Sequence, residues 1–203
     1  MAGSGRFIVV EGGEGVGKST QVPLLAASLR ASGREVVVTH EPGDTKLGGE
    51  LRAVLLHADN DLDARAELLL MIADRAQHLA EVVTPALARG AIVVCDRYEP
   101  STLAYQGVAR GLGVESVERL SEWATTGVEP DVVVVLDLPD EIAEARVSVD
   151  RDRFERAGPD FHARVRTAYR DLAPARGWVL VDADGTPDDV AARVLAAVSA
   201  VVP

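Results

Sequence analysis

A glycine-rich segment near the N-terminus narrows the possible folds more than any other part of the sequence. The segment GGEGVGKS fits the pattern G-x-x-x-x-G-K-[ST], directly after the apolar run FIVV and directly before a helical pattern. This context is that of a phosphate-binding loop between a strand and a helix. The predicted nucleotide-binding residues are Gly12, Gly13, Glu14, Gly15, Val16, Gly17, Lys18, Ser19 and Thr20.

The chemistry of phosphate binding explains these residue types. Glycines allow successive backbone N–H groups to face phosphate oxygens, and the N-terminus of the following helix adds its positive end. Lys18 is expected to reach the β- and γ-phosphates of a nucleoside triphosphate, and the Ser19 hydroxyl to bind Mg²⁺. We therefore expect a nucleoside triphosphate, with Mg²⁺ as the cofactor.

Runs of β-branched residues alternate with helical patterns along the whole chain. They have little polar alternation, which is typical of strands buried on both faces of a parallel sheet. We predict an α/β fold with a five-stranded, doubly wound parallel sheet flanked by helices, in one domain over residues 1–203. The predicted strands are residues 6–11, 35–40, 91–96, 131–138 and 178–183.

Three of the predicted strands have a carboxylate at or next to their carboxyl ends, namely Glu11, Asp96 and Asp137. Open parallel sheets bind ligands beyond the carboxyl ends of their strands, so these groups are expected to converge on one crevice. Capping of the following helix is an equal alternative for Asp137.

Composition excludes several classes of protein. The net charge of −11 argues against a sequence-tolerant nucleic-acid binder, which needs a basic surface. No apolar run reaches the roughly 18 residues of a membrane span, and the N-terminus lacks a secretory signal pattern. Cys95 is the single cysteine and lies in an apolar run, which predicts an inert buried thiol. We expect a soluble, cytoplasmic protein that binds neither nucleic acid nor membranes.

The lysines separate kinases from switch GTPases. A switch GTPase normally carries an Asn-Lys-x-Asp segment that recognises the base. Lys18 and Lys46 are the only lysines, and Lys46 lies in the context DTKLG, so this chain has no such segment. Kinases of small acceptors and ATPases that act on a partner remain.

An arginine on an apolar helix face is a candidate for an acceptor site. Leu68, Ile72, Leu79 and Val83 form a stripe at helical spacing, and Arg75 falls on it. A guanidinium there is costly unless something pairs with it. The alternatives to a ligand are a salt bridge to a neighbouring element and a snorkelling side chain.

Four segments, in this order and spacing, resemble the motifs of the bacterial thymidylate kinase family of P-loop nucleoside-monophosphate kinases. They are FIVVEGGEGVGKST, HEPGDTKLGGELR, ELLLMIADRAQH and CDRYEPSTLAYQG, and the resemblance covers nearly the whole chain. It implies transfer of the γ-phosphoryl group of ATP to dTMP, and a homodimer formed through the helices around residues 45–88. A kinase of another nucleoside monophosphate or a deoxynucleoside, and a P-loop ATPase switch on a protein partner, are the alternatives.

The resemblance also implies roles for the acceptor-site residues. Arg75 would bond the base edge, and Met71, where the family usually has phenylalanine, would cover the base ring. Arg52 would contact the acceptor phosphate, and Glu14 would face the 3′-hydroxyl of the sugar. The residues that would line the sugar and base are Ser101, Tyr105 and Gln106.

The predicted catalytic groups, besides Lys18, come from one strand end and one charged segment. Asp96 can hold Mg²⁺ through water, and Arg97 can bridge the phosphates of donor and acceptor. Family members with no arginine in the phosphate loop supply one from a mobile lid, which implies a lid near residues 146–158. Its candidate arginines, in order, are Arg153, Arg151 and Arg146. A solvated charged surface is the alternative for this segment.

Overall fold

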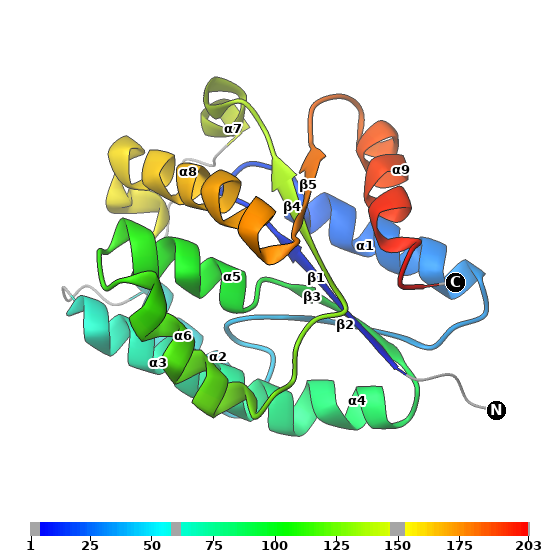
Figure 1. Ribbon diagram of the computed structural model, residues 1–203, viewed down its shortest axis with the longest axis horizontal. Coiled ribbons are helices and arrows are strands. Elements are labelled where there is room, and N and C mark those ends of the chain that lie inside the picture. The colour runs from blue at the N-terminus through cyan, green and yellow to red at the C-terminus, as the bar shows by residue number, and fades with distance from the viewer. Residues whose placement is uncertain (1–4, 58–61, 147–152, 203) are drawn as a thin grey trace.

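Five parallel strands form one sheet at the centre of the molecule (Figure 1). The computed structural model describes residues 5–57, 62–146 and 153–202. The strand order is β2-β3-β1-β4-β5, which confirms the predicted five-stranded, doubly wound parallel sheet. The strands are β1 (Arg6–Glu11), β2 (Val36–His40), β3 (Ile92–Asp96), β4 (Val132–Asp137) and β5 (Val179–Asp182).

The strands are apolar because both faces of the sheet are covered. In β1, Phe7 and Val9 pack into the core on one face, and Ile8 and Val10 pack into the core on the other. Successive side chains of a strand point to opposite faces, so a strand covered on both sides has no polar alternation. Cys95 of β3 is buried, as predicted.

Helices pack against both faces of the sheet (Figure 1). The helices α1 (Lys18–Ala31) and α9 (Pro187–Val198) cover one face, while α4 (Thr84–Ala88) and α8 (Pro159–Arg176) lie on the other. Further helices are α2 (Lys46–His57), α3 (Ala64–His78), α5 (Glu99–Thr102), α6 (Val114–Thr125) and α7 (Asp140–Arg146). Two π-helical segments, Leu79–Val83 and Leu103–Ala109, and the 3₁₀ turn Glu155–Ala157 complete the pattern.

None of the helices in the described part of the chain combines the length and the apolar character that crossing a bilayer requires.

The helix α1, which follows β1, is part of the phosphate-binding region. It begins at Lys18, after Gly17 in a left-handed conformation, and its buried side includes Val22, Leu25 and Leu29. Packing of that side on the sheet fixes the position of the helix N-terminus beside the carboxyl end of β1.

Candidate active site

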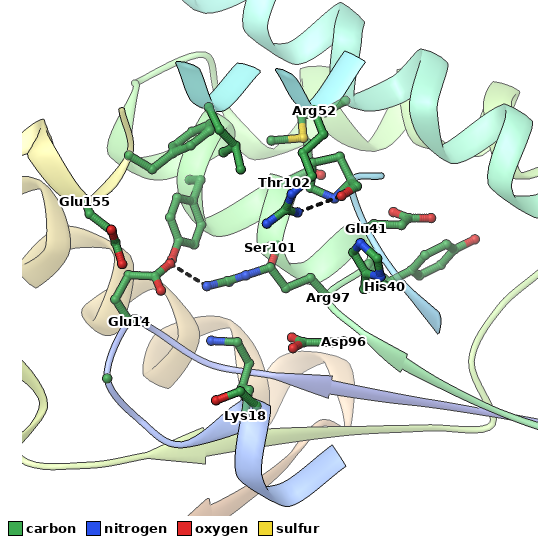
Figure 2. A pocket seen from close by; sticks show the side chains of 18 of the residues that line it. Glu14, Lys18, His40, Glu41, Arg52, Asp96, Arg97, Ser101, Thr102 and Glu155 are labelled. Carbon is green, nitrogen blue, oxygen red and sulfur yellow. Dashed lines mark hydrogen bonds and ion pairs between the residues drawn. The ribbon is translucent and has the colours of Figure 1, made fainter. Parts of the chain in front are cut away.

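A cavity of about 600 Å³ lies at the carboxyl ends of the strands, which is where open parallel sheets bind ligands (Figure 2). The phosphate loop, α2, α3, the segment after β3 and the end of α7 all contribute to it. Most of the predicted site residues therefore share one cavity. Those in its lining are Glu14, Gly15, Gly17, Lys18, Ser19, Thr20, Arg52, Met71, Arg75, Asp96, Arg97, Ser101, Tyr105, Gln106 and Arg146.

Some predicted residues lie elsewhere. Gly12, Gly13 and Val16 build the phosphate loop without lining the cavity, and Val16 packs into the hydrophobic core. Arg153 also lies outside the lining, and Arg151 falls outside the described residues.

The backbone of the phosphate loop holds the loop lysine in place. Lys18 Nζ donates to the carbonyl oxygens of Gly12 at 3.0 Å and Gly13 at 2.8 Å. Burial and the nearby Arg97 guanidinium lower the pKa of Lys18. The ammonium group is thus held at the centre of the loop, where it can reach the β- and γ-phosphates of a bound nucleotide.

Gly15 leaves no room for a side chain in the loop. Its φ is +76°, in the region that favours glycine, and a Cβ built there would overlap the carbonyl oxygen of Ala143 in α7. The same helix ends at Arg146, which lines the cavity. The helix that closes position 15 therefore also brings an arginine to the site.

Arg97 connects the phosphate loop to the opposite wall of the cavity. Its backbone has a φ of 70°, a strained conformation for a non-glycine residue and one that clusters at functional sites. In Figure 2 its side chain reaches from the strand end toward Glu14, and the two groups form an ion pair at 2.5 Å. The guanidinium also donates to Gly12 O at 3.2 Å and Ser101 Oγ at 3.0 Å.

Glu14 is an anion in this setting. The Tyr105 hydroxyl donates to its carboxylate at 2.9 Å. Burial alone would raise the pKa of Glu14, but the charges of Arg97 and Lys18 and this hydrogen bond outweigh it and lower the pKa to about 2. The carboxylate is therefore a hydrogen-bond acceptor at neutral pH, as its predicted contact with a sugar hydroxyl requires.

Glu11 supports the site from beneath. It is fully buried, and its carboxylate accepts from the backbone N–H of Tyr98 at 2.8 Å and of Ser101 at 3.1 Å. The hydroxyls of Ser101 and Tyr169 also donate to it, each at 2.7 Å. Burial raises the pKa of Glu11 even though Arg97 and these hydrogen bonds oppose the shift. Glu11 fixes the segment after β3 rather than lining the cavity.

The expectation that all three strand-end carboxylates converge on the crevice is wrong for Glu11 and Asp137. Asp137 pairs with Arg170 of α8 at 2.9 Å and does not line the cavity. An arginine one helix away competes for this carboxylate, and it draws the side chain to the α8 side. Among the three, Asp96 alone lines the cavity.

Asp96 and Ser19 offer oxygens suited to Mg²⁺. Asp96 Oδ1 is buried and has no hydrogen-bond partner among the described residues, and the Ser19 side chain lines the same cavity. The described residues hold no cluster of three or more histidine, cysteine or acidic side chains that could bind a metal alone. This set fits an ion that keeps several waters and is bound mainly through substrate phosphates.

Arg75 is buried in a polar cluster at the second wall of the cavity, which is formed by α2, α3 and the segment after β3. It is 2% exposed, and its Nε donates to Glu41 at 2.9 Å. Its other nitrogens donate to Thr102 Oγ1 at 2.8 Å and Ser121 Oγ at 3.3 Å. A salt bridge to a neighbouring element was one alternative for this arginine, and it is present, yet Arg75 also lines the cavity.

His78 and Asp74 extend this cluster on α3. His78 lies 2.8 Å from Glu41 Oε1 and 2.6 Å from Thr39 Oγ1. Asp74 is 1% exposed and accepts from the backbone N–H of Gly43 at 3.1 Å. Burial and the neighbouring charge of Glu41 raise the pKa of Asp74 to about 6.

We expect Asp74→Asn to stabilise the protein above about pH 6, by about 1–2 kcal/mol. In the unfolded chain an aspartate ionises near pH 4, so between roughly pH 4 and pH 6 only the folded state keeps this proton. The stability from that difference is full at low pH and is lost as the pH rises through the folded pKa. Asparagine cannot ionise, so it removes this loss.

Urea unfolding of wild type and Asp74→Asn between pH 4 and pH 8 measures this effect. Asp171→Asn, which changes an exposed aspartate on α8, serves as the control and should keep the wild-type slope. Parallel curves for wild type and Asp74→Asn would contradict the assignment.

Gln106 and Arg153 meet at a buried carboxylate that carried no signal in the sequence. Glu67 of α3 is 0% exposed, and it accepts from Gln106 Nε2 at 2.7 Å. Arg153 Nη1 pairs with it at 2.7 Å, while Arg153 Nε donates to Leu55 O at 2.7 Å. The arginine ranked first for the lid is thus turned away from the cavity, and Arg146, ranked last, lines it.

Comparisons with known proteins agree with the four motifs. A family model described as thymidylate kinase matches residues 10–194. A thymidylate kinase of Synechococcus sp. (strain JA-2-3B'a(2-13)) is 48% identical over 199 residues, which is 97% of this chain and 96% of that protein. The thymidylate kinase of Leifsonia xyli subsp. xyli (strain CTCB07) is 49% identical over 195 residues, covering 94% and 92%.

Proposed function

The chain belongs to the thymidylate kinase family, and from this we propose that it transfers the γ-phosphoryl group of ATP to dTMP, giving dTDP and ADP. One observation carries the proposal: the phosphate loop with Lys18 and a second wall with Arg75 face the same cavity. A P-loop ATPase that acts on a protein partner has no need of a second polar wall inside its nucleotide cavity. A phosphoryl transfer between two nucleotides needs both walls.

Alignment and charge neutralisation would do most of the catalytic work. The nucleophile is an oxygen of the acceptor phosphate and is already anionic, so no strong general base is needed. Lys18 would contact the β- and γ-phosphates of ATP, and Arg97 would bridge the donor and acceptor phosphates. Arg97 is suited to this role because its guanidinium already spans from Gly12 to Ser101.

Ser19 and Asp96 would hold Mg²⁺, the first through its hydroxyl and the second through a water molecule. The unpartnered, buried Oδ1 of Asp96 supports this assignment. When bound there, Mg²⁺ would neutralise part of the negative charge on the terminal phosphates.

The acceptor would occupy the wall formed by α2, α3 and the segment 96–106. Arg75 would donate to the edge of the base, and Met71 would cover its ring. Glu14 would accept a hydrogen bond from the 3′-hydroxyl, with Tyr105 packed against the 2′ carbon so that ribose is excluded. Arg52, whose Nη1 donates to Pro42 O at 2.7 Å, would contact the acceptor phosphate.

Further features of the proposal concern the lid and the assembly. The lid would lie near residues 146–158 and supply an arginine to the transferred group, with Arg146 favoured by its place in the cavity lining. We also propose a cytoplasmic homodimer formed through α2 and α3. Exposed apolar side chains on these helices, Leu47, Val54 and Leu69, offer a surface that a second copy would cover.

A panel of nucleotide acceptors with coupled detection of ADP tests the function. We expect kcat/KM for dTMP to exceed that for CMP, UMP, dCMP and deoxynucleosides by at least about tenfold. A preference for a ribonucleotide would favour the kinase of another monophosphate. ADP release that is stimulated only by a protein would favour the ATPase switch.

A further inference from the structure

One buried carboxylate collects donors from several elements beneath the acceptor side of the cavity. Glu67 Oε1 accepts from Gln106 Nε2 at 2.7 Å and from Arg110 Nε at 3.3 Å. Its Oε2 accepts from Arg110 Nη2 at 3.1 Å and from Arg153 Nη1 at 2.7 Å. A carboxylate beside two guanidinium groups can only accept hydrogen bonds.

This contact determines which way the Gln106 amide points. A glutamine side chain has a donor end, the NH₂ group, and an acceptor end, the carbonyl oxygen. The reverse orientation would set the amide oxygen against a carboxylate oxygen, which is repulsive. The NH₂ end of Gln106 is therefore held toward Glu67. Gln106 is only 1% exposed and lies in the π-helical segment Leu103–Ala109, which packs against α6 and α8.

We propose that Glu67 determines the base specificity of the acceptor site by holding the Gln106 amide oxygen toward the cavity. Gln106 lines the cavity, whereas Glu67 does not, so Glu67 is a positioning residue that acts through Gln106. The inference rests on the proposed function, because it concerns the same acceptor site.

The hydrogen-bonding groups at positions 3 and 4 of the pyrimidine ring fit this arrangement. Thymine and uracil present an O4 acceptor beside an N3–H donor, while cytosine presents an N4 amino donor beside an N3 acceptor. Arg75 supplies donors to the cavity wall, and the Gln106 oxygen supplies an acceptor. Thymine and uracil satisfy both groups. Cytosine would face a donor with a donor and an acceptor with an acceptor.

The variant Glu67→Gln tests the inference. The oxygen of the new amide would be drawn to Arg110 and Arg153, so its NH₂ end would face Gln106 and reverse that side chain. We expect the ratio of kcat/KM for dTMP to kcat/KM for dCMP to fall by at least about tenfold. The ratio for dTMP to dUMP should stay within about twofold of wild type, because both bases carry N3–H.

The readouts separate this inference from the function on which it rests. If wild type does not prefer dTMP to dCMP, the proposed function fails. If wild type has that preference and Glu67→Gln keeps it, only the role of Glu67 fails. A general loosening of the site would move the dTMP to dUMP ratio and the KM for ATP as well, and that result would also overturn the role.

Arg110→Gln is the matched control, since it removes a partner of Glu67 but leaves the contact with Gln106. It should keep the wild-type dTMP to dCMP ratio, and an equal fall would overturn the inference. In a Gln106→Leu background, Glu67→Gln should cause no further fall in that ratio, whereas additive effects would show that Glu67 does not act through Gln106. If Glu67→Gln does not fold, Glu67→Asp keeps the charge, withdraws the carboxylate by one methylene and enters the same cycle.

Discussion

Lys18→Ala should lower kcat by at least about 10³-fold and leave the protein folded. The ammonium group lies inside the phosphate loop, with Gly12 O and Gly13 O as its partners. In the proposed mechanism its charge lies where negative charge develops on the transferred group, and a neutral methyl cannot replace it. The fold should tolerate the change because burial and Arg97 already disfavour the charged form of this lysine.

Coupled ADP formation with dTMP as acceptor measures the loss, and circular dichroism with thermal unfolding checks the fold. Lys46→Ala is the matched control, since Lys46 is the one other lysine in the sequence and is exposed at the start of α2. It should keep wild-type activity. Robust ADP formation by folded Lys18→Ala would refute the mechanism.

Arg97→Gly should lower kcat by about 10²–10³-fold with little change in the fold. The guanidinium contacts both Glu14 of the phosphate loop and Ser101 of the acceptor wall, so its loss removes the group that we propose to span the two substrates. Glycine adopts the left-handed conformation of this residue without steric cost, so the backbone around it should persist.

Thr126→Gly is the control for the backbone effect. Thr126, with a φ of 49°, is the other non-glycine residue with positive φ in the described ranges, and it lies at the C-terminus of α6, away from the cavity lining. Its replacement should leave kcat unchanged. Activity in Arg97→Gly within a few fold of that in Thr126→Gly would remove Arg97 from the mechanism.

The sheet and the phosphate loop could be predicted because their signals are local in the sequence. Each strand is a short β-branched run, and burial on both faces leaves that run without polar interruptions. The loop requires its glycines and its lysine at fixed spacing, so the pattern alone identifies it. The burial of Cys95 followed from the same reasoning.

The parts that could not be predicted depend on pairing between distant side chains. Glu11 accepts from Tyr169, a residue 158 positions away, and a strand-end carboxylate gives no sign of such a partner. Arg75 has no evident partner on its own helix, because its partners Glu41 and Thr102 lie on other elements. The position of Arg153 depends on Glu67, whose sequence context is that of an ordinary helix residue.

The close approach of α7 to the phosphate loop restricts how this enzyme can evolve. An arginine at position 15 needs α7 to retreat, because a Cβ at Gly15 would overlap the carbonyl oxygen of Ala143. Retreat of α7 would also carry Arg146 away from the cavity that it lines. With α7 in its present position, the cavity can therefore take an arginine from position 146 but not from position 15.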